Sequence, residues 1–92
     1  MNARIATSMV LLSAMLLAGC SPERDCRDAI KLAKPRVYGA INTGANQEAN
    51  EQISQAYADV AEAEELAVAG DFKGCIEKVN SARVLLNKSQ RN

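Results

Sequence analysis

Several residue types are scarce or missing in this chain of 92 residues, and their scarcity excludes whole classes of function. Histidine is absent, which removes imidazole catalysis and most transition-metal sites. Tryptophan is absent too, and the aromatic residues are Tyr38, Tyr57 and Phe72, too few for a platform that stacks single-stranded nucleic acid. The 11 basic and 11 acidic side chains cancel, so no net positive charge favours a nucleic-acid partner, and we expect none.

A long apolar run is also lacking. Residues 5–17 are almost wholly apolar, but a membrane-spanning helix needs about 20 such residues. A short polar start containing Arg4 precedes this run, and small residues follow it. This order is typical of a secretory signal peptide, so we expect residues 1–19 to be a signal peptide that is cleaved off.

The apolar run ends in a motif, Leu17-Ala18-Gly19-Cys20, that resembles the lipobox of bacterial lipoproteins. In that family the cysteine is acylated with fatty acids such as palmitate and becomes the first residue of the mature chain. The resemblance therefore implies a lipid anchor at Cys20, strong enough to hold the protein firmly on a bilayer. In enteric lipoproteins a serine after the cysteine, here Ser21, favours the outer membrane, with the protein facing the periplasm. An ordinary signal peptide that contains a cysteine is the alternative.

The chain has three cysteines, and an odd number leaves at least one without a disulfide partner in the chain. The lipobox accounts for that one as Cys20. Cys26 and Cys75 remain in an oxidising compartment, and we expect a disulfide between them. Two buried reduced thiols are the alternative. A CxxC motif and an activating histidine are both missing, so a catalytic cysteine is not expected.

Apolar residues recur at helical spacing in three segments, which predicts an all-α fold. The expected helices cover residues 22–41, 46–69 and 72–88. Pro35 is expected to kink the first helix, or to end it near Ala33 and restart it. Gly70 and Asp71 form a turn so tight that the second and third helices become antiparallel neighbours. We therefore expect a small three-helix up-down-up bundle, which brings Cys26 and Cys75 to the same end.

Core and boundaries follow from the same spacing. A tether at 20–22 is expected to precede the helical domain, 23–88, and a polar tail at 89–92 is expected to fray. The predicted core stripes are Cys26, Ile30, Ala33, Val37 and Ile41 in the first helix; Ile53, Ala56, Tyr57, Val60, Ala63 and Ala67 in the second; and Phe72, Cys75, Ile76, Val79, Ala82 or Arg83, and Leu86 in the third.

Charge alternates in sign along the chain. Residues 23–36 carry a net charge of +2, residues 45–71 carry −7 and residues 72–92 carry +4. An acidic helix between two basic ones can form ion pairs along both of its flanks. One interpretation makes an acidic docking face for a basic partner from four residues: Asp59, Glu62, Glu64 and Glu65. The other is an ordinary solvated helix surface.

The stretch 61–86 resembles a single tetratricopeptide-type hairpin. Its matching positions are Ala63, Leu66, Gly70-Asp71-Phe72, Ile76 and Ala82, but the tryptophan of that motif is not present. Because such repeats need several stacked copies, the resemblance implies a helical hairpin and little about partners.

Catalytic groups are not recognisable in the sequence. The carboxylate pair Glu64-Glu65 lies in an alanine-rich helix without an apolar pocket, and no glycine-rich phosphate loop is present. We expect no enzyme activity, cofactor, metal or small-molecule substrate.

The expected role is that of a non-catalytic structural or protein-interaction module of the bacterial cell envelope. Cys20 and Cys26 are only six positions apart, which places the domain and its protein partner close to the membrane. Size, lipobox and a short mature domain also resemble the superinfection-exclusion lipoproteins of conjugative plasmids and phages. A third possibility is an inhibitor or accessory subunit of an envelope secretion or pilus assembly.

Overall fold

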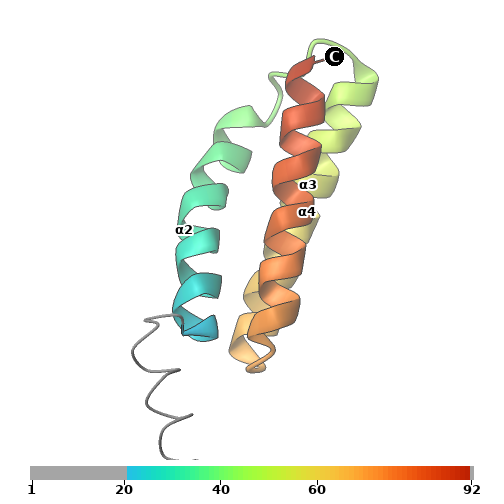
Figure 1. Ribbon diagram of the computed structural model, residues 1–92. Coiled ribbons are helices and arrows are strands. Elements are labelled where there is room, and N and C mark those ends of the chain that lie inside the picture. Colours follow the sequence, from blue (N-terminus) through green and yellow to red (C-terminus); the bar gives the residue numbers. More distant parts are fainter. Residues whose placement is uncertain (1–20, 92) are drawn as a thin grey trace, which may run out of the picture.

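The computed structural model describes residues 21–91, which form three helices and, within that range, no strand. The helices are α2 (Pro22–Ala40), α3 (Gln47–Val68) and α4 (Phe72–Arg91). Figure 1 shows the start of α2 and the α3–α4 turn at one end of the bundle, with the α2–α3 connection and the end of α4 at the other. The all-α fold and the three-helix up-down-up bundle expected from the sequence are confirmed.

Each helix begins at a side chain that accepts a backbone N–H of its first turn. The capping residues are Ser21, Asn46 and Asp71. Asn46 Oδ1 lies 2.8 Å from the backbone nitrogen of Ala49, and Asp71 Oδ1 lies 2.9 Å from that of Gly74. These bonds satisfy N–H groups that have no partner within the helix, and so they set where each helix starts.

The turn between α3 and α4 depends on Gly70. Its φ of 85° lies in the left-handed region, which a side chain disfavours. The backbone N–H of Asp71 reaches back to the carbonyl oxygen of Leu66 at 2.8 Å. This is how α3 ends and α4 starts almost at once, which makes the two helices antiparallel neighbours.

Two expectations concern helix ends. First, α2 is one continuous helix that contains Pro35, so the alternative in which the helix ends near Ala33 and restarts is wrong. Pro35 and Lys31 are both exposed, so the carbonyl that loses its N–H partner lies on the solvent side of the helix. Second, residues 89–91 do not fray but extend α4 to Arg91, because Ser89 continues the buried stripe and its hydroxyl donates to the carbonyl oxygen of Leu86 at 2.7 Å.

The core lies between the three helices and consists mainly of small side chains. Its buried members are Cys26, Ala33, Val37, Ile53, Ala56, Val60, Ala63, Cys75, Val79, Ala82 and Leu86. Of the two alternatives for the third stripe, Ala82 is buried and Arg83 is exposed. Four other predicted core residues are only partly buried: Ile30, Ala67, Phe72 and Ile76. Tyr57 and Ile41, both expected in the core, are about half exposed, because each lies at the edge of its stripe.

Candidate functional site

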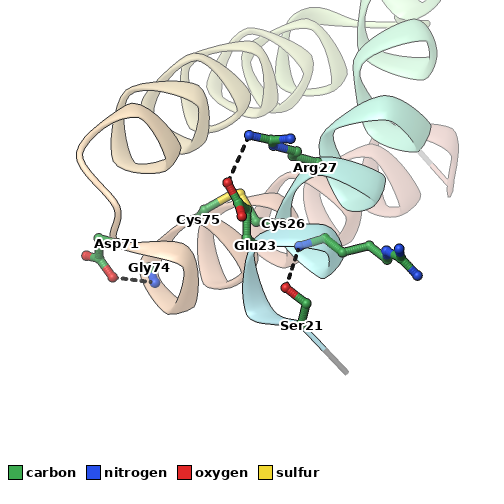
Figure 2. Close-up of a disulfide and its surroundings, with 8 residues drawn as sticks. Ser21, Glu23, Cys26, Arg27, Asp71, Gly74 and Cys75 are labelled. Carbon is green, nitrogen blue, oxygen red and sulfur yellow. Dashed lines mark hydrogen bonds and ion pairs between the residues drawn. A yellow bond between two sulfur atoms is a disulfide. The ribbon is translucent and has the colours of Figure 1, made fainter. Parts of the chain in front are cut away.

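The two cysteines of the described residues form a disulfide, as predicted. Cys26 in α2 and Cys75 in α4 have their Cα atoms 5.8 Å apart, and both side chains are fully buried. Figure 2 shows the bond next to the starts of both helices, with Ser21 at one side and Asp71 at the other. The bundle is therefore covalently closed at the end where the chain enters α2.

The predicted signal peptide, residues 1–19, and the predicted lipidation residue, Cys20, lie outside the described residues. The chain is described from Ser21 onward. Ser21 already caps α2 and Pro22 is its first residue, so Pro22 belongs to the helix and not to the tether. The segment between the predicted anchor and the bundle is therefore a single residue, Ser21.

The four acidic residues proposed as one docking face do not share a face. Asp59 is only 3% exposed, and its two carboxylate oxygens accept bonds from Gln55 Nε2 at 3.0 Å and Ser81 Oγ at 2.8 Å. Glu62 pairs with Lys78 of α4 at 3.2 Å. Asp59 and Glu62 thus both contact α4, but only Asp59 is buried there, while Glu62 stays exposed beside Lys78.

Glu64 lies on the opposite side of α3 and pairs with Lys34 of α2 at 3.0 Å. Glu65 is exposed between these two flanks. The expected pairing of the acidic helix with both basic neighbours is therefore present, through the intramolecular ion pairs of Glu62 and Glu64. The hydrogen bond and the negative charge of Glu64 raise the pKa of Lys34 above its ordinary value of 10.5.

Two tyrosines lie beside the Lys34–Glu64 ion pair where α2 packs against α3; we call such a line of contact between two helices a seam. Tyr38 and Tyr57 stack with ring centroids 5.5 Å apart, and Lys34 Nζ lies 5.7 Å from the centroid of Tyr38. Stacking of this kind and a cation over the ring both contribute favourably. The α2–α3 seam is thus closed by aromatic and ionic contacts.

The third seam, between α2 and α4, has basic side chains on both helices that are not in ion pairs among the described residues. Arg36 of α2 donates to Asn87 Oδ1 of α4 at 3.3 Å, a neutral acceptor. Arg83 of α4 lines the same side of the bundle, and within residues 21–91 neither arginine forms an ion pair. The two arginines border a hollow of about 270 Å³ whose other walls are apolar, formed by Ala29, Leu32 and Ala33.

Sequence reasoning missed this hollow, although the charge pattern contains the signal for it. In a three-helix bundle every helix contacts the other two. Acidic side chains of α3 pair with a basic side chain of α2 along one seam and with one of α4 along another. The seam that α2 and α4 share must then bring two basic helices together, which is where Arg36 and Arg83 lie.

Among residues 21–91, no group of three or more His, Cys, Asp and Glu side chains could hold a metal ion. None of the helices α2, α3 and α4 is long and apolar enough to cross a membrane.

Comparison with protein-family models, with curated proteins and with solved structures finds no match to this chain.

Proposed function

We propose that this protein is a small lipoprotein of the bacterial envelope, anchored through Cys20 and acting as a non-catalytic protein-interaction module that faces the periplasm. The observation that carries the proposal is the lipobox-like Leu17-Ala18-Gly19-Cys20 at the end of a short apolar run. Acyl chains on Cys20 would supply the membrane affinity that one short apolar segment cannot.

Two structural features support the proposal. The Cys26–Cys75 disulfide suits an oxidising compartment such as the bacterial envelope, since disulfides are rare in a reducing cytosol. The N-cap at Ser21 supports a close approach to the membrane, because two residues of extended chain span only about 7 Å. The partner is accordingly another envelope protein near the bilayer.

The lipid anchor is tested by fractionation of cells that produce Cys20→Ala. The parent protein is expected to incorporate labelled palmitate and to stay with membranes after a high-salt wash. Cys20→Ala is expected to incorporate none and to leave the membrane fraction. A Cys20→Ala protein that stays with washed membranes contradicts the proposal.

The outer-membrane location has its own test. Ser21→Asp keeps an oxygen that can cap α2, so the bundle is expected to fold unchanged. In an enteric host this variant is expected to move to the inner membrane on a density gradient, while the matched variant Ser21→Asn, which also caps the helix, serves as the control for folding. Identical gradients for the parent and Ser21→Asp contradict the outer-membrane location.

A further inference from the structure

The surface between α2 and α4 is the only helix seam of residues 21–91 in which cations from both sides lack an acidic partner. Lys34 and Lys78 each pair with a glutamate of α3, whereas Arg36 and Arg83 have none. Both arginines border one hollow, and its five lining residues include no acidic side chain. Two like charges at one hollow repel each other, and an anion placed there would relieve that repulsion.

The hollow also has an apolar wall. Leu32 is 73% exposed at its rim, although it is a large apolar side chain, and Ala29 and Ala33 are too small to cover it. A ligand that combines a carboxylate with an apolar group would pair with the arginines and cover Leu32 at once. Arginine suits such a site, because its planar guanidinium binds a carboxylate through two parallel bonds.

The seam extends beyond this hollow toward the α2–α3 connection. A second hollow of about 280 Å³ also has Arg36 on its wall and continues past Gly39 and Ala40 to Ser89 and Gln90. Its lining residues include no acidic side chain. From Ala29 to Ala40 the α2 side of the seam is about 16 Å long, since a helix rises about 1.5 Å per residue. A surface of this length and shape fits a peptide segment better than a single small anion.

From these observations we propose that the α2–α4 seam (Leu32, Arg36 and Arg83 with the two hollows that Arg36 joins) binds an acidic, partly apolar segment of a partner protein. The proposal deepens the proposed interaction function, on which it rests, by assigning the docking surface and the chemistry of the partner. The charge of this surface is opposite to that of the acidic docking face that is one interpretation of the sequence: the partner is acidic and the docking surface basic, because Asp59, Glu62 and Glu64 already bond to side chains of this chain.

The test uses the intact protein, purified in detergent, and a fluorescent peptide that alternates leucine with glutamate. A second peptide, with glutamine in place of every glutamate, controls for apolar binding. Fluorescence anisotropy is expected to show binding of the glutamate peptide alone, weakened by added salt. Arg36→Gln combined with Arg83→Gln is expected to weaken binding about tenfold, as for two exposed ion pairs. Arg24→Gln, which removes an exposed arginine from another part of α2, is expected to leave it unchanged.

A charge exchange separates loss of binding from loss of fold. The double variant Arg36→Glu with Arg83→Glu is expected to lose the glutamate peptide and to bind a leucine–lysine peptide that the parent rejects. Equal binding of the glutamate and glutamine peptides, or an effect of Arg24→Gln as large as that of the seam variants, would overturn the proposal. Since peptide binding in detergent does not depend on acylation, failure here leaves the Cys20 fractionation result intact, and failure of the anchor leaves the peptide result intact.

Discussion

Cys26 and Cys75 are bonded with their Cα atoms 5.8 Å apart, although 49 positions separate them in the chain. The loop that the bond closes contains the whole of α3, Gln47–Val68. A core built mainly from alanine and valine buries little apolar area for each residue, so a covalent constraint contributes a large share of the stability in so small a domain.

Removal of the disulfide is the first prediction. Replacing both Cys26 and Cys75 with alanine is expected to lower the free energy of unfolding by about 4 kcal/mol, the loop-closure value for a loop of this length. Urea unfolding followed by circular dichroism measures the change. Reductant should shift the midpoint of the parent and leave that of the double variant where it is. A parent midpoint that does not respond to reductant contradicts the prediction.

The starts of the helices and the disulfide could be predicted from the sequence because each follows from a local rule. Ser21 before Pro22, and Gly70 before Asp71, combine a capping oxygen with a residue suited to a helix start or end. Once three helices and a tight turn are assumed, the positions of Cys26 and Cys75 place them at one end. Here local chemistry and topology lead to the same answer.

The edges of the core and the acidic residues could not be placed in the same way. The spacing of residues in the sequence gives the direction of each side chain around its own helix. Whether that side chain is buried depends on the positions of the neighbouring helices. Tyr57 therefore lies half exposed, while Ser89 is buried. Likewise Glu62 and Glu64 are two residues apart, which turns them about 200° from each other on a helix, so they pair with different neighbours.

The turn at Gly70 gives the second prediction, in which two glycines respond in opposite directions. Gly70→Ala is expected to destabilise the protein by about 1–2 kcal/mol, because an alanine at a φ of 85° is strained. Gly39 lies inside α2, and an added Cβ there would meet nothing within 4 Å. Gly39→Ala is thus expected to stabilise by about 0.5 kcal/mol through its better helix propensity. Thermal unfolding of both variants against the parent measures the pair, and shifts of the same sign would contradict it.

The buried carboxylate of Asp59 gives the third prediction. Asp59→Ala is expected to cost about 1–3 kcal/mol of stability, because it removes the acceptor for both Gln55 and Ser81. Glu65→Ala, on the exposed side of the same helix, is the matched control and is expected to change stability by less than about 0.5 kcal/mol.

A double-mutant cycle tests whether Asp59 and Ser81 act together across the α3–α4 seam. Ser81→Ala is combined with Asp59→Ala, and the unfolding free energies of both single variants are subtracted from that of the double variant. The expected coupling is about 0.5–3 kcal/mol. Strictly additive effects would show that the 2.8 Å bond between these side chains contributes nothing to the bundle.

The ion pair between Lys34 and Glu64 gives the last prediction, a dependence on alkaline pH. The hydrogen bond to Glu64, its negative charge and the nearby Tyr38 raise the pKa of Lys34 above 10.5 in the folded protein. A lysine that holds its proton more tightly when folded contributes stability that is complete below its unfolded pKa. That contribution is lost as the pH rises through the higher folded pKa. The pair is therefore expected to support the fold at neutral pH and to stop doing so above pH 10.5.

Glu64→Gln tests this directly, because glutamine keeps an acceptor oxygen but removes the charge. Titration of Lys34 followed by NMR is expected to show a lower pKa in Glu64→Gln than in the parent, and urea unfolding a smaller loss of stability at alkaline pH. Glu65→Gln removes a charge from the next residue, which is exposed, and is expected to leave the titration of Lys34 nearly unchanged. If both variants lower the pKa of Lys34 equally, the general charge of α3 and not the 3.0 Å contact with Glu64 controls this lysine.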